Sequence, residues 1–444
     1  MEEAVVERTT FRAFRIPLGS GNPFALMRSP AFICVLCLVS WIGSSQDHSF
    51  GLPALDTVYD PAVKSILFYR QTPEETLPVM TMARSDYLEL QFDILDGSPR
   101  ELYYTIFHFD QHWTPNDLRP EEYLAGFQEE RVTEFAASSK TQLPYVNYRF
   151  QLHSEIFLIS GNYLVCVSDR FRNVLFTRRF FVSQNNILVS VKFRDPANAN
   201  VYRSHQALEL TVNTNKLVIP NNGKEINVQL LQNGDPNTMQ QRNIPNLYAG
   251  ELFYFNRVDD LLFKGMKEYR RKDIRTILST TQDIKFWDEK DGQYHCWLEH
   301  DIIRHYKSYF TDYDINGKFI PMNRDRDDAA LESEYVMVHF TLLAREPVEQ
   351  PVYIYGNLTD WQLKPEFLME YDASRGAYQG AAWLKMGYYN FMYAVPDDKG
   401  LPDTSPMEGD WYETENDYNV LVYYRPFGSR YDQLLFAGTF NSNN

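Results

Sequence analysis

The sequence predicts an all-β protein built from several packed β-sandwich domains, and three observations support this. Aromatic residues make up 15% of the 444 residues, which suits the half-buried surface of a pleated sheet. Short apolar runs recur at the spacing of sandwich strands, and turn pairs such as Asp-Gly, Asn-Gly and Ser-Gly separate them. A chain of this length also has room for two to four domains with real cores.

The N-terminal segment has the layout of a secretory signal. An apolar run, Ala31–Gly43, follows a single basic residue and precedes Ser44 and Ser45. Small residues at these positions predict cleavage between Ser45 and Gln46. Residues 1–45 are therefore interpreted as upstream sequence and signal peptide, with residues 1–26 preceding Met27, where such a signal begins.

The signal run could instead be a buried strand or helix, but nothing amphipathic flanks it. It is too short to span a bilayer comfortably, and no later apolar run reaches about 18 residues. We therefore expect an exported protein without direct membrane insertion.

The first expected domain, residues 46–185, is organised around the strand Leu102–Phe109. Both faces of this strand are apolar, which predicts a central strand that is covered on both sides. The next stretch, Asp110–Glu122, carries two prolines and four acids, so we expect an ordered loop. Loops of this length are usually functional or disordered, and the aromatic residues here argue against disorder. The apolar run Tyr123–Phe127 then leads back into the domain.

The same domain holds further strand patterns. Its last two predicted strands are Asn162–Ser168 and Phe176–Val182. The pattern of Gly161–Val167 followed by Arg178–Val182 resembles the last two strands of an immunoglobulin-like or fibronectin-like sandwich. The other predicted strands are Ile66–Tyr69, Leu88–Asp93 and Tyr148–Leu152.

Two more domains are expected, at residues 186–332 and 333–444. The strands predicted for the middle domain are Ile187–Phe193, Leu208–Asn213, Ile226–Gln232 and Leu252–Phe255. Those of the C-terminal domain are Tyr335–Leu343, Val352–Tyr355, Ala377–Leu384, Tyr388–Tyr393 and Asn419–Tyr424. Tyr353–Trp361 followed by Lys385–Tyr393 resembles the sandwich of starch- and glycogen-binding modules. Because no Pro-rich linker separates the domains, we expect them to pack on one another. Val258–Leu278 is charged and mixed and gives no prediction.

Charge and cysteine content narrow the class of protein. The formal net charge of −16 argues against nucleic acid or an anionic membrane as partner, because binding phosphates needs clustered Lys and Arg. After export, Cys166 and Cys296 remain, far apart in sequence and in different expected domains. Two cysteines are no disulfide framework, so we expect two buried free thiols.

Candidate metal ligands do not form a complete site in the sequence. Asp312–Gly317 matches the first half of a calcium loop, but Asn323 stands where such a loop needs a bidentate Glu. We interpret it as an Asn-Gly hairpin turn between 309–313 and 318–321. His108 and His112 are four apart on and after a strand, where that spacing separates side chains by roughly 13 Å. No metal or cofactor is therefore expected.

No catalytic set can be recognised either. The chain lacks a Gly-x-Ser-x-Gly elbow, a phosphate loop and a dinucleotide fingerprint. The acidic pairs Glu121-Glu122 and Asp259-Asp260 are interpreted as solvated. Trp361 could stack on a sugar ring, but packing against a sheet edge is the commoner role of such a residue, and the same holds for Trp113. We expect a non-enzymatic protein, while a secreted hydrolase with an unrecognised site stays open.

A family resemblance goes further than these patterns. From about Asp56 to Gly438 the chain resembles the type IX secretion system plug protein. The segments that carry the resemblance are Phe107–Trp113, Pro120–Phe127, Ser139–Tyr148, Ser160–Tyr163, Glu268–Arg270, Asp314–Gly317, Tyr353–Gly356, Lys385–Gly387, Glu408–Tyr418, Tyr423–Arg425 and Arg430–Asp432.

The resemblance implies a periplasmic protein at the inner face of the outer membrane. It would reversibly close the periplasmic opening of the giant translocon β-barrel when no cargo is secreted, and would be monomeric apart from that complex. The family supplies no catalytic residues. From the loop itself we select Trp113, Pro115, Asp117 and Arg119 as candidate partner-binding residues. A secreted or periplasmic carbohydrate-binding protein is the alternative function.

Overall fold

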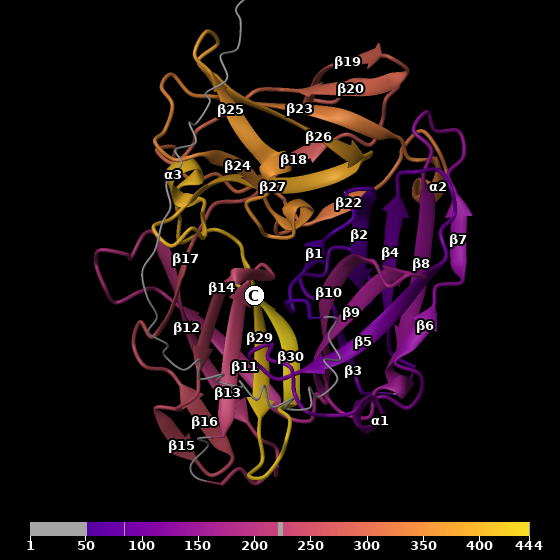
Figure 1. Cartoon of the computed structure of the whole chain (residues 1–444). Coiled ribbons are helices and arrows are strands. Elements are labelled where there is room, and N and C mark those ends of the chain that lie inside the picture. Colours follow the sequence, from indigo (N-terminus) through magenta and orange to yellow (C-terminus); the bar gives the residue numbers. More distant parts are fainter. Residues whose placement is uncertain (1–50, 84, 221–224, 444) are drawn as a thin grey trace, which may run out of the picture. The chain divides into compact units, whose positions relative to one another are not determined.

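The computed structural model describes residues 51–83, 85–220 and 225–443. The expected signal peptide and cleavage site lie outside these residues. The described chain consists of strands and loops with only short helices, which confirms the all-β prediction (Figure 1). The three α-helices are α1 (Pro120–Tyr123), α2 (Ala329–Glu332) and α3 (Ser405–Glu408). Within the described residues, no helix has the length and apolar character needed to cross a membrane.

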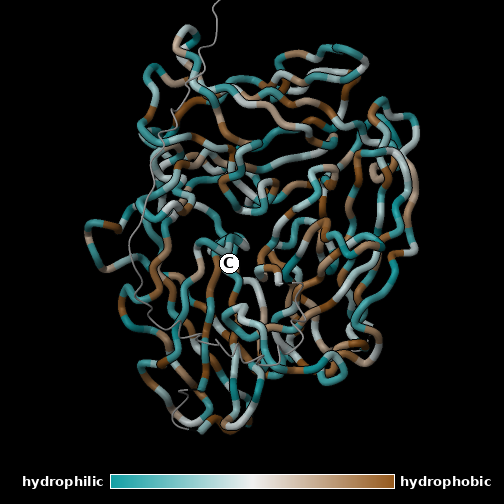
Figure 2. The backbone as a smooth tube through the Cα atoms, viewed as in Figure 1, coloured by the Kyte–Doolittle hydropathy of each residue, from teal (hydrophilic) through white to brown (hydrophobic). Residues whose placement is uncertain are grey.

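Hydrophobic and hydrophilic residues alternate along many of the strands (Figure 2). This is the pattern from which the strands were predicted, since successive side chains of a strand point to opposite faces. The strands form three sandwich units, here called the first, second and third sandwich.

The first sandwich consists of two antiparallel layers. One sheet contains β1 (Thr57–Val58), β10 (Val174–Ser183), β9 (Gly161–Asp169), β5 (Leu102–Phe109) and β6 (Glu129–Arg131), and β3 (Val79–Thr81) adds to β10 in parallel. The other sheet contains β2 (Val63–Tyr69), β4 (Tyr87–Ile94), β8 (Val146–His153) and β7 (Glu134–Ala137).

The strand β5 is central, as predicted. It pairs with β9 and β6, and seven of its eight residues are buried. On its inner face Tyr104 stacks on Phe150 of the opposite sheet, with ring centroids 4.3 Å apart. On its other face Phe107 and Phe109 pack with Leu164 and Cys166. Coverage of both faces explains why neither face of this strand is polar.

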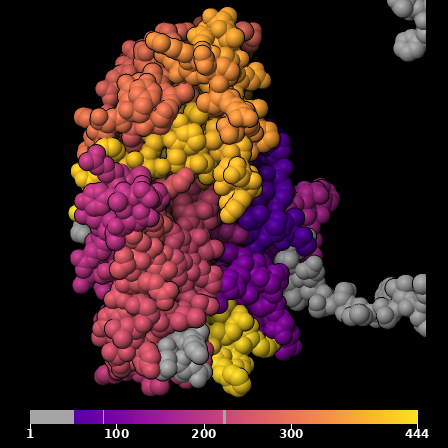
Figure 3. Space-filling model, turned by 90° about the vertical axis from the view of Figure 1, so that its left-hand side faces the viewer, coloured from indigo at the N-terminus to yellow at the C-terminus, as the bar shows by residue number. Residues whose placement is uncertain are grey.

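The second sandwich is discontinuous in sequence. One sheet contains β11 (Leu188–Arg194), β12 (His205–Asn213), β16 (Leu252–Phe255) and β15 (Leu247–Ala249), with β17 (Leu261–Lys264) also on β12. The other contains β14 (Asp235–Arg242), β13 (Ile226–Gln232), β29 (Asp417–Tyr424) and β30 (Gln433–Asn441). The pairing of β13 with β29 joins residues as far apart in sequence as Ile226 and Tyr424. Figure 3 accordingly shows yellow C-terminal residues both beside the orange third sandwich and at the second sandwich.

The third sandwich is inserted between β17 and β29. Its sheet runs β18 (Arg270–Asp273), β27 (Gly387–Pro396), β24 (Val352–Tyr355), β25 (Leu368–Asp372), β26 (Ala377–Lys385), β23 (Tyr335–Leu343), β20 (Gln293–Leu298) and β19 (Ile284–Lys290). Three short strands extend it: β21 (Asp301–Ile302) on β23, and β22 (Phe319–Pro321) and β28 (Pro402–Asp403) on β27. The sheet folds over on itself, so that Phe340 of β23 and Phe391 of β27 meet in the core with ring centroids 5.4 Å apart.

The sheets do not follow the expected division into a middle domain, residues 186–332, and a C-terminal domain, residues 333–444. Strands in 188–264 and 417–441 share one core, and strands in 270–403 share another. Alternation within a strand predicts that the strand exists, but it carries no information about a partner remote in sequence. The expected boundary at 185/186 falls between β10 and β11. The stretch without a prediction, Val258–Leu278, contains β17 and β18 and the crossing between two sandwiches.

The Asn-Gly turn is present, but the hairpin around it is not. Asn316 and Gly317 have φ angles of 49° and 78°, as a type I′ turn requires. Residues 309–313 form no strand, however, and β22 pairs with β27 instead. A Cβ on Gly317 would lie 2.5 Å from the Trp361 ring, so glycine is needed here for space as well as for φ. The hairpin prediction was wrong because the turn reverses the chain inside a loop.

Both remaining cysteines are buried free thiols, as expected. Burial raises the pKa of Cys166 and that of Cys296 to about 12. Both thiols therefore stay protonated and unreactive at neutral pH.

The first and third sandwiches are joined by a buried ion pair. The Lys385 ammonium lies 2.7 Å from an Asp93 oxygen, and both side chains are almost fully buried. The Tyr335 hydroxyl donates to the same carboxylate at 2.7 Å, and the ammonium lies 4.3 Å from the centre of the Tyr145 ring. Burial lowers the pKa of Lys385, and Asp93 opposes this shift. The expected packing of the domains thus includes a specific polar contact.

We predict that Asp93→Asn lowers the free energy of unfolding by about 3–5 kcal/mol, because it leaves the Lys385 charge buried without a counterion. Urea denaturation would measure the loss. Glu134→Gln is the matched control, because the Glu134–Arg149 pair is exposed, with side chains 65% and 62% accessible. It should change stability by no more than about 0.5 kcal/mol. Equal effects of the two substitutions would contradict the prediction.

Candidate functional site

The loop Asp110–Glu122, which was predicted to carry contact residues, is ordered and is partly a structural element. The Asp110 carboxylate accepts hydrogen bonds from the main-chain nitrogens of His112 and Thr114, each at 2.8 Å. Trp113 adopts a positive φ of 61° and packs against Phe181. The Arg179 guanidinium lies 4.3 Å from the centre of the Trp113 ring. Trp113 is therefore a half-buried anchor of the loop.

The other three candidate contact residues of this loop are exposed. Pro115 bridges to Phe109 through its main chain and is solvent-exposed. Asp117 lies 3.8 Å from Arg430, and Arg119 lies 3.9 Å from Glu122. Such exposed ion pairs contribute little to stability, so Asp117 and Arg119 can interact with a partner without damage to the fold.

The C-terminal hairpin holds this loop in place. Asp432, 1% exposed, receives two hydrogen bonds from the Arg425 guanidinium at 2.7 and 2.8 Å, a bidentate geometry. The same carboxylate accepts from the main-chain nitrogen of Gln111 at 2.9 Å. Gln229 of β13 donates to the Gln111 carbonyl, also at 2.9 Å. The loop is thus part of the junction between the first and second sandwiches.

His108 is a buried structural residue of this junction. Asn116 donates to its Nδ1 at 2.5 Å, and its Nε2 faces the Ser160 carbonyl at 3.4 Å. Burial lowers the pKa of His108 to about 4, so the ring is neutral at pH 7. Gly161 has a φ of 147°, and a Cβ there would lie 2.5 Å from His108 Nε2. His112 lies in an exposed turn, which agrees with the expectation that the two histidines do not share a metal.

Other segments that carry the family resemblance meet at the same junction. The Tyr423 hydroxyl donates to the Asn162 side chain at 2.6 Å, and Leu434 donates through its main chain to Ser160 Oγ at 3.0 Å. These segments are far apart in sequence, yet they join the first sandwich to the C-terminal strands.

A second group of these segments lies within the third sandwich and at its junction with the second sandwich. Glu408, fully buried, accepts from Arg270 at 2.9 Å and pairs with Arg304 at 2.5 Å. Burial would raise the pKa of Glu408, but the two guanidinium groups hold it at about 2. The Tyr355 hydroxyl donates to Asp235 of β14 at 2.5 Å. Both junctions are therefore built from buried, hydrogen-bonded polar groups.

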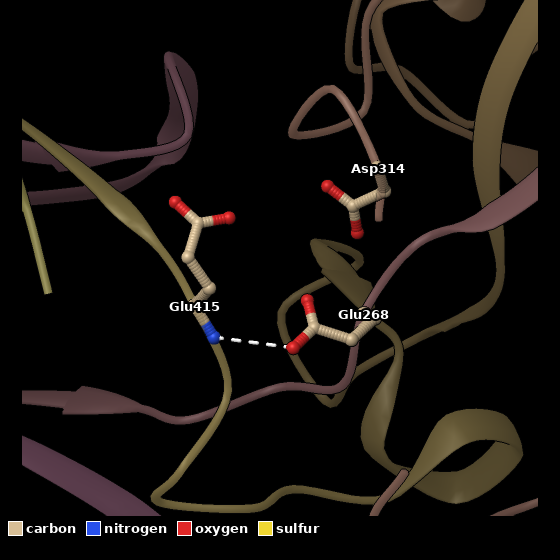
Figure 4. Close-up of side chains that lie close together, drawn as sticks. All are labelled: Glu268, Asp314 and Glu415. Atoms are coloured by element: carbon tan, nitrogen blue, oxygen red, sulfur yellow. Dashed lines mark hydrogen bonds between the residues drawn. The ribbon is translucent and has the colours of Figure 1, made fainter. Parts of the chain in front are cut away.

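Three carboxylates come together beside the second junction: those of Glu268, Asp314 and Glu415 (Figure 4). One oxygen of each lies within 4.8 Å of the others. The Asp314 oxygens accept from the main-chain nitrogens of Tyr269 and Asn316. Glu268 Oε1 accepts from the main-chain nitrogen of Glu415 at 3.3 Å and from the Tyr309 hydroxyl. These acids come from three loops that sequence reasoning did not connect, although the half calcium loop pointed to Asp314.

The three carboxyl groups of this acidic cluster have pKa values above those usual for Asp and Glu. Burial, with repulsion from Glu268 and Glu415, raises the pKa of Asp314 to about 7. Burial also raises the pKa of Glu268 and that of Glu415. Arg304 offsets only part of this effect at Glu268. A group of acids that still repel one another can share protons or bind a cation, and either would relieve the repulsion.

Trp361 does not offer a platform for sugar. Its side chain is 4% exposed and packs against Tyr269 and Tyr355. This agrees with the interpretation that Trp361 packs against the sheet, so its ring is not available to stack on a sugar.

A groove of about 420 Å³ lies between the first and third sandwiches, and charged side chains line part of it. Asp360 of this groove pairs with Arg178 at 2.8 Å and with Lys364 at 2.5 Å. Its carboxylate is thus held in ion pairs on both sides, an arrangement that suits structure better than proton transfer.

The loop 303–318 carries three exposed aromatic side chains, and we call it the aromatic loop. Tyr306, Phe310 and Tyr313 are 69%, 80% and 76% exposed. Large aromatic side chains are enriched in the buried cores of protein interfaces. These residues could not be predicted as an exposed group, because the residue pattern of a loop does not reveal which side chains are exposed.

Comparison with known proteins identifies the first sandwich. Residues 63–184 match the family model of the type 9 secretion system plug protein 1st domain. The first sandwich belongs to the type IX secretion system plug family. The matched range coincides with the strands from β2 to β10, and it confirms the family resemblance. No curated protein matches the chain.

The fold beyond the plug domain also has a solved counterpart. The chain is similar to a hypothetical protein from Parabacteroides merdae whose crystal structure is known. The two sequences are 26% identical, the alignment covers 88% of this chain and 100% of the other chain, and the TM-score is 0.83. The likeness therefore extends well past residue 184, so the second and third sandwiches belong to a shared architecture.

We predict that His108 makes stability depend on pH. Its ordinary pKa is 6.5 and its folded-state pKa about 4, so between these values the unfolded chain binds a proton that the folded chain does not. The contribution of His108 is thus present above pH 6.5 and is lost as the pH falls to about 4, up to roughly 3 kcal/mol.

Chemical denaturation between pH 7.5 and 4 would measure this dependence. The slope of stability against pH should be shallower for His108→Gln than for the wild-type protein. His112→Gln, at the exposed position, should keep the wild-type slope. Identical slopes for the wild type and His108→Gln would count against a buried neutral imidazole.

Proposed function

We propose that this protein is a non-enzymatic periplasmic plug of the type IX secretion system. It would close the periplasmic opening of the outer-membrane translocon reversibly while no cargo is being secreted. The observation that carries the proposal is the match of the first sandwich to the plug-protein family. Periplasmic location and the β-barrel partner are part of the proposal.

The architecture supports a blocking role. A barrel wide enough for folded cargo breaches the permeability barrier when idle, so its plug must be a rigid folded body that binds reversibly. Buried polar contacts hold the three sandwiches together: the Lys385–Asp93 ion pair joins the first to the third, and the Tyr355–Asp235 hydrogen bond joins the third to the second. Incorrect docking would leave one of these charges buried and unpaired, which costs several kcal/mol.

The exposed surface offers two contact regions. One is the outer side of the Asp110–Glu122 loop, with Pro115, Asp117 and Arg119. The other is the aromatic loop, whose side chains are the type that most often anchors interfaces. An interface of standard size, roughly 1,600 Å² in total, can be tight yet displaceable because affinity depends on a few anchors.

Deletion of the gene should leave the translocon assembled but make the outer membrane permeable to large hydrophilic compounds, because the idle barrel then stays open. Vancomycin sensitivity would measure the leak, and the secretion of native cargo should largely persist. A deletion strain with normal resistance, together with failure of the protein to co-purify with any outer-membrane barrel, would rule out the plug role.

The aromatic loop should contribute binding energy without contributing stability. We expect replacement of Tyr306, Phe310 and Tyr313 together by Ser to reduce co-purification with the translocon at least tenfold, about 1.4 kcal/mol. Melting temperature should stay within about 2 °C, since exposed side chains contribute little to folding. Phe427→Ser is the matched control, since Phe427 is fully exposed on the β29–β30 loop.

The same assay distinguishes the two contact regions. If the triple variant binds normally and an Asp117→Lys, Arg119→Glu variant does not, the Asp110–Glu122 loop is the contact surface. Trp113→Ala should lower the melting temperature whichever region binds, because Trp113 anchors its loop.

A further inference from the structure

The incomplete calcium loop of the sequence is completed in space. Asp312–Gly317 lacks the glutamate that a contiguous calcium loop would place twelve residues after its start. In the fold, Asp314 meets two glutamates from distant parts of the chain, Glu268 and Glu415. The three carboxylates of this acidic cluster come from the segment between β17 and β18, the aromatic loop, and the segment between α3 and β29.

The cluster lacks the cationic partners that other acids at this junction have. Arg270 and Arg304 pair with Glu408, and Arg271 pairs with Asp312 at 3.1 Å. The nearby Lys267 ammonium donates to two main-chain carbonyls. The basic side chains at this junction are therefore committed to other acceptors.

Two buried oxygens at the cluster are left without a donor. Glu268 Oε2 and Asn316 Oδ1 have no hydrogen-bond partner among the described residues, and their residues are only 3% and 8% exposed. The Asn316 amide reaches the cluster, since its Nδ2 lies 3.5 Å from Glu415 Oε1. Figure 4 shows the unbonded Glu268 oxygen directed toward the other two carboxylates. Buried oxygen atoms without a donor are costly, and a cation can satisfy them.

We propose that Glu268, Asp314 and Glu415 bind one calcium ion. The donor set is all oxygen, with no histidine or cysteine, which selects a hard cation. Ligands from three separate loops suit calcium, which accepts six to eight oxygens in irregular geometry, better than magnesium, which requires a near-ideal octahedron. Water and main-chain carbonyls complete the shell. The site reverses the expectation from sequence that no metal binds.

The ion would join the two chain crossings between the second and third sandwiches. Glu268 lies where the chain enters the third sandwich, and Glu415 lies where it returns. Asp314 adds the aromatic loop to the same point. Since the three ligands converge only in the folded protein, calcium binds the folded state selectively and stabilises it.

The test uses the purified protein stripped with EDTA. Isothermal titration with calcium chloride should give one site per chain. The melting temperature should rise by about 3 °C at a calcium concentration a hundredfold above the dissociation constant. Glu268→Gln and Glu415→Gln should each abolish the rise. Glu415→Gln keeps the test valid if the more buried Glu268 variant misfolds. Asp312→Asn, in the same loop but outside the cluster, should keep the rise.

Three results would overturn the proposal. The first is the absence of binding heat and of a melting shift at about 10 mM calcium, above the range of weak extracellular sites. The second is a full calcium response in both glutamine variants, which would place the ion elsewhere. The third is a Glu415→Gln protein in EDTA that melts as high as calcium-loaded wild type with no calcium response of its own, which would indicate carboxylates that share protons.

Discussion

The antiparallel pairing of β13 with β29 is the contact on which the rest of the structure depends. Because these strands come from opposite sides of a long insertion, the second sandwich cannot close until the third has been traversed. The chain must leave after Lys264 and return before Asp417, so its two crossings are forced to lie together. Arg270 and Glu268 on one crossing therefore meet Glu408 and Glu415 near the other.

The junctions show what buried charge contributes to this protein. A buried ion pair gains little over an apolar pair of similar size, because desolvation offsets the attraction. Its effect is on specificity: Glu408 is satisfied only when Arg270 and Arg304 reach it together, and Lys385 only when Asp93 faces it. The Lys385–Asp93 pair selects one arrangement of the first and third sandwiches, and the Glu408 pairs fix α3 and the aromatic loop against β18 within the third sandwich. If the protein blocks an opening, as proposed, a single arrangement matters more than additional stability.

Strands were predictable from sequence where two-residue alternation or continuous apolar character was strong, as in Leu102–Phe109 and Tyr335–Leu343. The apolar pattern was weak in β14, where one residue of eight is buried, and in the mostly exposed β19, so neither of these two strands was predicted. Pairing partners were not predictable, which is why the insertion was missed. The acidic cluster was out of reach for the same reason: Asp314 could be singled out, but its neighbours depend on the closure of β13 on β29.

Many of the segments that carry the family resemblance contribute buried residues rather than surface residues. Asp432, Tyr423, Asn162 and Glu408 lie in the segments that carry it, and all four are buried at junctions. Shared sequence of this kind follows from a shared way of locking the sandwiches together. It need not mark the surface that meets a partner, since exposed side chains are free of such packing constraints. The exposed aromatic residues of the aromatic loop, Tyr306, Phe310 and Tyr313, lie outside those segments, and Trp113, within one, is an internal anchor. Residues that anchor a partner are therefore best sought in exposed segments outside those that carry the family resemblance.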